Sequence, residues 1–233
     1  MKTIIKENSH EIAKEVADKI ISLVKAKPNC VLGLATGSTP IETYDLIIKR
    51  AKEENVDFSK VVTFNLDEYV NNPDFSQSYR FFMDEHLFNH INIDKKNTHF
   101  PSEENYKEYD KMIEDAGGVD FQILGIGSDA HIGFNEPGTS FSSLTHIAQL
   151  KESTIKDNSR FFKSIDDVPT SAITMGLESI MRSKEIALIA LGANKAKAIK
   201  DSVSSISEEV PASILQRHEN AFIYCDKEAA KLL

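Results

Sequence analysis

The sequence predicts an α/β fold, an open, mainly parallel sheet with helices on both faces. Two observations support this class: apolar runs of strand length recur along the chain, and amphipathic stretches of helical period separate them. Parallel neighbouring strands need a crossover connection, which is usually a helix. The 233 residues, of which 41% are hydrophobic, are enough for one globular core, so we expect a single domain over residues 1–233.

The predicted elements alternate along the chain. The strands are CVLGLAT at 30–36, VVTFNL at 61–66, VDFQILGIG at 119–127, EIALIALG at 185–192 and NAFIYCD at 220–226. The helices span about 9–24, 40–53, 78–90, 103–116, 193–204 and 226–233. The stretch from Asn135 to about Asp167 has no clear period and is rich in Ser, Thr, Asn and Asp. Its length and composition suit an active-site lid or an ordinary surface excursion.

Charge and hydropathy exclude several classes of partner. The chain has 27 basic and 36 acidic residues, a net charge of −9, and so lacks a general attraction to nucleic acid or an anionic membrane. No apolar run approaches the ~18 residues of a membrane-spanning helix, and the opening residues lack the apolar core of a signal peptide. We therefore expect a soluble, cytoplasmic protein. Cys30 and Cys225 lie in predicted strands and are expected to be buried, reduced thiols.

A candidate anion site follows the first of these predicted strands. The chain passes through Thr36, Gly37, Ser38 and Thr39 into a helix that starts near Pro40. Gly37 allows close backbone approach, the hydroxyls can donate, and the helix N-terminus favours negative charge. An ordinary N-cap explains the same pattern almost equally well. The turn lacks the Gly-Lys pair and the spaced glycines of nucleotide sites, so nucleotide chemistry is disfavoured.

Ionisable residues follow two further strands. Asp67 comes directly after 61–66, and the loop after 119–127 contains Asp129, His131 and Glu136. Ligands of open α/β sheets bind outside the carboxyl ends of the strands, so these groups are expected to face one crevice. Two neighbouring carboxylates can fix the tautomer of His131 and make it a proton shuttle, while Asp67 serves as a separate base. Two proton-transfer stations indicate an isomerisation.

Structural roles remain an alternative for each of these residues. Asp67 could cap a helix or pair with a lysine, and Asp129 could hold the loop through an Asx turn. Asp129, His131 and Glu136 are also able to ligate a divalent ion. A single imidazole without a second His or a Cys cluster is weak evidence for such a site, so we predict no metal.

Six motifs together resemble the glucosamine-6-phosphate deaminase family in order and spacing. They are LGLATGSTP, VVTFNLDEYV, QSYRFFMDEHLF, GIGSDAHIGFNEPG, NSRFF and LGANKAKA, and they extend over nearly the whole chain. The resemblance implies a modified Rossmann-like fold of the sugar-phosphate isomerase type. It also implies conversion of glucosamine 6-phosphate and water to fructose 6-phosphate and ammonium without a cofactor. The Asp-Glu-Tyr strand end and the Phe-Asn-Glu-Pro continuation make the match specific.

The resemblance implies catalytic roles by matching position. Asp67 is expected to take the proton from C2 of the substrate and deliver it to C1. His131 is expected to act as the acid–base group of ring opening. Asp129 and Glu136 are expected to orient and tune the imidazole, so that their loss costs rate rather than folding.

The resemblance also implies two cationic ligands for the substrate phosphate. Arg160, in NSRFF, and Lys195, in LGANK, match those ligands and would add charge to the turn at 36–39. Without the resemblance, each would be interpreted as a solvated surface cation. Binding of phosphate by Arg160 would close the segment 135–167 over the sugar as a lid.

Two departures from the family pattern lead to further expectations. Ala130 stands where the family usually has Gly, so the loop is expected to adjust if this position requires positive φ. The stretch Leu144–Ala148 lacks most of the basic residues that bind N-acetylglucosamine 6-phosphate in allosteric members. The chain also lacks the longer tail of the allosteric hexamers. We therefore expect no such activation, and a monomer or a small homo-oligomer.

Two rival functions stay open. A 6-phosphogluconolactonase resembles this fold and shares a Gly-x-Asp-x-His loop, but typically continues with Thr-Ala-Ser instead of Ile132-Gly133-Phe134. A sugar-phosphate-sensing regulator could use the same crevice for binding alone. Such a regulator needs an output module, and the sequence shows no basic helix-turn-helix segment. Its retention of Asp67, Asp129, His131 and Glu136 together would also be unexplained.

Overall fold

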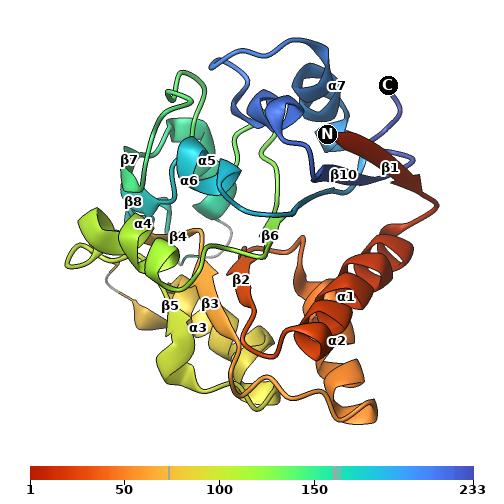
Figure 1. Ribbon diagram of the computed structural model, residues 1–233. Coiled ribbons are helices and arrows are strands. Elements are labelled where there is room, and N and C mark those ends of the chain that lie inside the picture. Colours follow the sequence, from red (N-terminus) through yellow and green to blue (C-terminus); the bar gives the residue numbers. More distant parts are fainter. Residues whose placement is uncertain (73, 160–161, 163) are drawn as a thin grey trace.

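The main sheet of the computed structural model is parallel throughout (Figure 1). The structure describes residues 1–72, 74–159, 162 and 164–233, with the backbone alone at 153, 157 and 158. Within these residues the strand order is β1 (Lys2–Lys6), β10 (Ala221–Asp226), β9 (Ile186–Ala190), β6 (Phe121–Leu124), β2 (Val31–Leu34), β3 (Val62–Asn65) and β5 (Thr98–His99). The four central strands β9, β6, β2 and β3 are almost completely buried, which explains their continuous apolar sequences.

Helices cover both faces of this sheet, as predicted. In Figure 1, α1 (Ser9–Ala26) and α2 (Ile41–Glu53) pack together on one face, and α7 (Ala196–Ser204) lies on the other. Helix α1 starts where the Asn8 side chain accepts a hydrogen bond from the backbone N–H of Glu11 at 3.0 Å. Its residues Ile12, Val16 and Ile20 form a buried stripe at four-residue spacing, which docks the helix on the sheet.

A second, three-stranded antiparallel sheet lies beside the main one. Its strand order is β4 (Asp67–Tyr69), β8 (Ser171–Thr174) and β7 (His146–Gln149). The chain leaves β3 after Asn65 and enters β4 at Asp67, with only Leu66 between the two sheets. Asp67 therefore lies at the junction of the sheets, beside the carboxyl edge of the main sheet.

The five predicted strands are all present, and five of the six predicted helices are present in whole or in part. The other helices are α3 (Tyr79–His86), α4 (Tyr106–Asp115), α5 (Glu152–Asn158) and α6 (Leu177–Met181). The predicted helix at 226–233 is wrong: β10 continues through Asp226, and the residues after it form turns, in which the N–H of Ala229 donates to the Asp226 carboxylate at 2.7 Å. The strands β1, β5, β4, β7 and β8 were not predicted. They are short or lie at sheet edges and lack a long apolar run.

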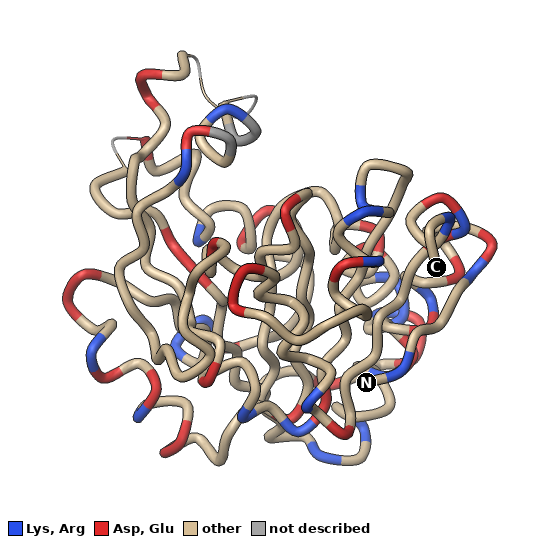
Figure 2. The backbone as a smooth tube through the Cα atoms, turned by 90° about the horizontal axis from the view of Figure 1, so that it is seen from above, with Lys and Arg blue, Asp and Glu red and all other residues tan. Residues whose placement is uncertain are grey.

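Both cysteines are buried and free. Burial raises the pKa of the Cys30 thiol to about 12 and that of Cys225 to about 11, which agrees with the prediction of unreactive structural thiols. Along the described chain, no helix combines the length and the apolar character needed to cross a bilayer. Figure 2 shows Lys and Arg interspersed with Asp and Glu rather than gathered on one side.

Candidate active site

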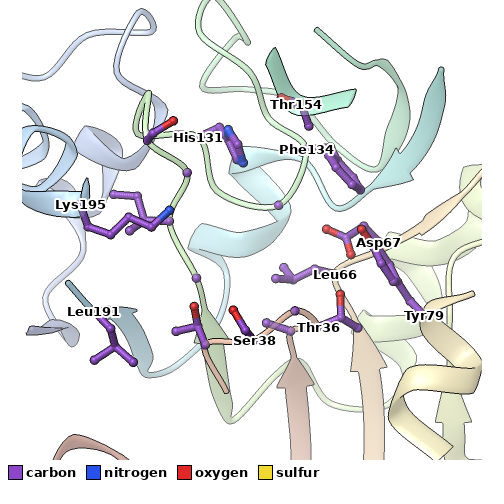
Figure 3. A pocket seen from close by; sticks show the side chains of 18 of the residues that line it. Thr36, Ser38, Leu66, Asp67, Tyr79, His131, Phe134, Thr154, Leu191 and Lys195 are labelled. Atoms are coloured by element: carbon purple, nitrogen blue, oxygen red, sulfur yellow. The ribbon is translucent and has the colours of Figure 1, made fainter. Parts of the chain in front are cut away.

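A crevice of about 460 Å³ opens at the carboxyl ends of four adjacent strands, β9, β6, β2 and β3. Its lining includes the turn at 36–39, Asp67, His131 and Lys195, all of which the sequence nominated. Figure 3 shows His131 across from Thr36 and Ser38, and Lys195 reaching in from the side opposite Asp67. The strand ends thus bring the proposed anion site and the proposed proton-transfer groups together.

The turn after β2, residues 36–39, lines the crevice and is held on its core side by a buried tyrosine. The Tyr44 hydroxyl, which is buried in the core, donates to the Ala35 carbonyl at 2.6 Å. Gly37 has φ +83°, a left-handed conformation that favours glycine. Pro40 precedes the first residue of α2, and no side chain caps this helix end. The N-cap alternative for the hydroxyls is therefore not what the structure shows, and a helix start without a side-chain cap is a position that favours an anion.

Asp67 is buried, with 8% of its surface exposed, yet its side chain lines the crevice. Loss of solvation raises the pKa of this carboxyl to about 8, with a further contribution from the neighbouring Glu68. Within the described part of the chain, Asp67 neither caps a helix nor pairs with a lysine, so those structural alternatives do not hold. A carboxyl with a pKa near 8 can accept and return a proton near neutral pH.

The neighbouring Glu68 has a structural role, because its side chain holds the start of α3. Its carboxylate accepts hydrogen bonds from the backbone N–H groups of Tyr79 and Arg80, at 3.0 and 3.1 Å. This places the Tyr79 ring in the crevice, where it stacks against Phe134 with ring centroids 6.2 Å apart. Burial raises the pKa of the Glu68 carboxyl, and the N–H donors oppose that shift.

The loop after β6 sets the imidazole. The Nδ1 atom of His131 lies 2.7 Å from an Asp129 carboxylate oxygen and 3.9 Å from Oε2 of Glu136. The hydrogen bond with His131 lowers the pKa of the Asp129 carboxyl well below its ordinary value. An ionised Asp129 requires a proton on Nδ1, so Nε2 is the nitrogen left for a substrate. Asp129 also accepts the backbone N–H of His131 at 3.4 Å, so its loop-holding role coexists with tautomer control.

Two backbone features make room for this imidazole. A Cβ atom on Gly127 would lie 2.2 Å from Cε1 of His131, so only glycine allows the ring its position. The expected adjustment of the loop does not occur: Ala130 itself adopts the left-handed conformation, with φ +67°. That conformation costs roughly 1–2 kcal/mol for a non-glycine residue. The Ala130 methyl is buried and its carbonyl accepts the N–H of Ala212 at 3.0 Å, contacts that hold the strained residue.

The other predicted residues lie in different settings. Glu136 is buried behind His131, and Thr154 of α5 donates to it. Arg160 lies outside the described residues. Sequence reasoning missed Tyr79 and Thr154 as members of the crevice. Tyr79 lay inside a quoted motif, but no local pattern distinguishes either residue from an ordinary helical one, because their place follows from tertiary packing.

A turn rich in hydroxyl groups beside a buried carboxyl and a carboxylate-bonded imidazole, at the carboxyl edge of a parallel sheet, is typical of an α/β enzyme. A family model described as glucosamine-6-phosphate isomerases/6-phosphogluconolactonase matches residues 5–224. Proteins named glucosamine-6-phosphate deaminase from Thermoanaerobacter sp. (strain X514) and Clostridium tetani (strain Massachusetts / E88) are 51% and 52% identical over 241 residues. The alignments cover 100% of this chain and 95% and 100% of those relatives. The chain therefore belongs to the glucosamine-6-phosphate deaminase family.

Two solved structures resemble this chain to different degrees. A monomeric glucosamine-6-phosphate deaminase matches with a TM-score of 0.96 at 40% identity, and 100% of each chain is covered. The 6-phosphogluconolactonase of Thermotoga maritima matches with a TM-score of 0.75 at 18% identity, over 97% of this chain and 98% of that one. The second likeness shows the shared fold alone. The predicted fold class is confirmed.

Proposed function

We propose that this protein converts glucosamine 6-phosphate and water to fructose 6-phosphate and ammonium in the cytoplasm, as a step of amino-sugar catabolism. One observation carries the proposal: Asp67 and His131, from different strand ends, face one crevice beside an anion turn. Full-length relatives at about half identity bear the name of this activity. The proposed chemistry uses acid–base groups of the chain itself, without a metal or a cofactor.

The substrate phosphate is proposed to bind at the turn 36–39. Thr36, Gly37, Ser38 and Thr39 supply hydroxyl and N–H donors at the start of α2, and Lys195 supplies positive charge from the end of β9. Arg160 is proposed as a second cation on the basis of its motif. With the phosphate at this turn, the sugar is proposed to extend toward Asp67 and His131, which line the same crevice.

Ring opening is proposed to come first. Nε2 of His131 takes the proton of the C1 hydroxyl and returns it to the ring oxygen as the C1–O5 bond breaks, giving the open-chain aldehyde. Asp129 holds Nδ1–H at 2.7 Å throughout, so the imidazole keeps its tautomer and its orientation. The nearby Glu136 carboxylate stabilises the transient imidazolium.

Isomerisation and loss of ammonia are proposed to follow. Asp67 removes the proton from C2, and the C–H electron pair forms the C1=C2 bond of the enolamine, while the aldehyde oxygen takes one proton from the C2 ammonium group of the substrate and becomes a hydroxyl. Asp67 returns its proton to C1, and the nitrogen lone pair forms an iminium at C2. Water then adds to C2 and the nitrogen departs as ammonium with the protons of that water, so atoms and charges balance.

We also propose that the segment 135–167 acts as a lid within a single domain, 1–233. The segment contains β7 and α5, and Thr154 of α5 lines the crevice. Phe162 packs edge-on against Tyr69, with ring centroids 5.7 Å apart. The segment therefore contacts the aromatic residue that lies two positions after Asp67. The solved deaminase that matches over its full length is described as monomeric, which supports a monomer here.

The direct test is turnover by the purified protein. Glucosamine 6-phosphate should yield ammonium and fructose 6-phosphate in equal amounts, with rates unchanged by a chelator. The chelator control is needed because donor atoms of Asp129, His131 and Glu136 lie within 4.8 Å of one another. Hydrolysis of 6-phosphogluconolactone alone would move the protein to the lactonases. Binding of sugar phosphate without turnover of either compound would favour a sensor.

A further inference from the structure

We infer that Thr154 is a positioning residue that couples α5 to the acid–base loop by holding the Glu136 carboxylate beside His131. The inference rests on the proposed function and deepens it, because it connects the proposed lid to the proposed proton relay. The two side chains come from separate elements, Glu136 from the loop after β6 and Thr154 from α5.

The contact itself is short and shielded from water. The Thr154 hydroxyl donates to Oε1 of Glu136 at 2.6 Å, with 6% and 7% of the two residues exposed. A hydrogen bond to a carboxylate at this distance is charge-assisted and stronger than one between neutral groups. In a low-dielectric setting, removal of the donor leaves the carboxylate poorly compensated. The hydroxyl therefore has a larger influence on Glu136 than a surface threonine would have.

The other carboxylate oxygen of Glu136, Oε2, connects the Thr154 contact to His131. Oε2 of Glu136 is buried without a hydrogen-bond partner among the described residues, and it lies 3.9 Å from Nδ1 of His131. That nitrogen is already bonded to Asp129. Glu136 thus lies just beyond hydrogen-bond distance of the imidazole that is proposed to carry the proton in ring opening. Thr154 fixes this distance, because its bond to Oε1 determines where Oε2 points.

The position of α5 makes the contact a link to substrate binding. Thr154 itself lines the crevice, and Figure 3 shows it above Phe134 on the same side as His131. A shift of α5 away from the crevice would withdraw the hydroxyl and release Glu136. Proton transfer through His131 is therefore strongest when α5 is seated. The ionisable groups next to Glu136 on its own loop are His131 and, through it, Asp129.

The test compares Thr154→Val, which keeps the shape and removes the hydroxyl, with Thr154→Ser, which keeps the hydroxyl. For Thr154→Val we expect kcat to fall about 10- to 100-fold, the range of one hydrogen bond to a charged group, with KM changed less than about twofold. The pH–rate profile of Thr154→Val should differ from that of the wild type, because Glu136 is no longer held beside the proposed acid–base group His131. Thr154→Ser should restore kcat to within about threefold and restore the profile.

A matched control is available on the same glutamate. The Thr139 hydroxyl donates to the backbone carbonyl of Glu136, also at 2.6 Å. Thr139→Val therefore removes a hydrogen bond to Glu136 but leaves the contacts of its carboxylate unchanged. Its pH profile should match the wild type. Equal loss of kcat in Thr154→Val and Thr154→Ser, or an unchanged profile in Thr154→Val, would overturn the role of Thr154. Thr154→Ala replaces Thr154→Val if the latter does not fold. Absence of turnover in the wild type would instead overturn the proposed function.

Discussion

Asp67 combines two properties that rarely occur together in a carboxyl group, burial at the start of a strand and access to a crevice. Nothing in the described part of the chain neutralises its charge, so burial keeps the proton on the group up to about pH 8. Such a residue weakens the fold whenever it ionises. Proteins accept that loss of stability at sites where the charge is used.

The first prediction concerns Asp67→Asn and stability. The pKa of about 8 exceeds the ordinary value of 3.8, so between these pH values the folded chain holds a proton that the unfolded chain releases. The stability that this proton contributes is complete below about pH 4 and is lost as the pH rises through about 8. Asparagine buries no charge, so Asp67→Asn should exceed the wild type by more than about 2 kcal/mol at pH 8.5, since one pKa unit is worth about 1.4. Urea unfolding at pH 4 and 8.5 measures the difference, and no gain at pH 8.5 would refute this description of Asp67.

The second prediction concerns Asp129→Asn. The amide keeps the size of the side chain, but its NH2 group can donate to Nδ1 of His131 and favour the tautomer in which Nε2 carries the proton, so Nε2 no longer accepts a proton from the substrate. We expect kcat to fall by about 10²–10⁴-fold, the usual effect of disturbing an acid–base group, with stability changed by less than about 1 kcal/mol. Steady-state kinetics and thermal unfolding of the same sample measure both. Full activity would show that Asp129 only supports the loop.

At the scale of elements, the decisive feature is the passage from β3 to β4. One residue, Leu66, separates a buried parallel strand from an antiparallel one. Because side chains alternate along a strand, Asp67 faces the crevice while Glu68 holds the N-terminus of α3. The two adjacent carboxylates therefore have different surroundings: Asp67 lines the crevice, and Glu68 supports the start of α3 at Tyr79.

The third prediction follows from this division. Glu68→Ala leaves the N–H groups of Tyr79 and Arg80 without their acceptor, at roughly 1–3 kcal/mol for each group that stays buried. We expect a loss of about 2–4 kcal/mol in unfolding free energy and a higher KM, because the start of α3 moves the Tyr79 ring. Glu68→Gln retains one acceptor oxygen and should lose less. Wild-type stability and KM in Glu68→Ala would exclude an anchoring role.

Buried parallel strands were predictable because their residues are apolar on both faces, and strand ends then placed the turn, Asp67 and His131 in one crevice. The strands of the second sheet were not, because three or four residues of mixed polarity carry no period. The helix predicted at 226–233 failed because β10 continues through Asp226 and turns follow it. Thr154 could not be predicted as a neighbour of Glu136, because only tertiary packing brings α5 to that loop.

For the whole molecule, the question is whether one chain suffices for activity. The described lining of the crevice comes from elements of a single chain. The stretch Leu144–Ala148, where allosteric relatives are expected to carry basic effector ligands, instead leads into β7 at the edge of the second sheet, with Ile147 exposed.

The fourth prediction is therefore simple saturation behaviour. Rates should follow a hyperbola in glucosamine 6-phosphate, and N-acetylglucosamine 6-phosphate should not activate the protein. Analytical ultracentrifugation under assay conditions should give one species near 26.0 kDa. A sigmoidal curve that the effector makes hyperbolic, or a stable hexamer, would contradict this prediction.

The most direct test of the central claim is the turnover of glucosamine 6-phosphate by Asp67→Asn beside the wild type, with binding of an unreactive sugar phosphate measured on both. If Asp67 moves the proton between C2 and C1, the variant should lose at least about 10³-fold in kcat. Its affinity for the sugar phosphate should stay within a few fold, because the turn at 36–39 and Lys195 are untouched. Ammonium release by Asp67→Asn at a rate near that of the wild type would contradict the account.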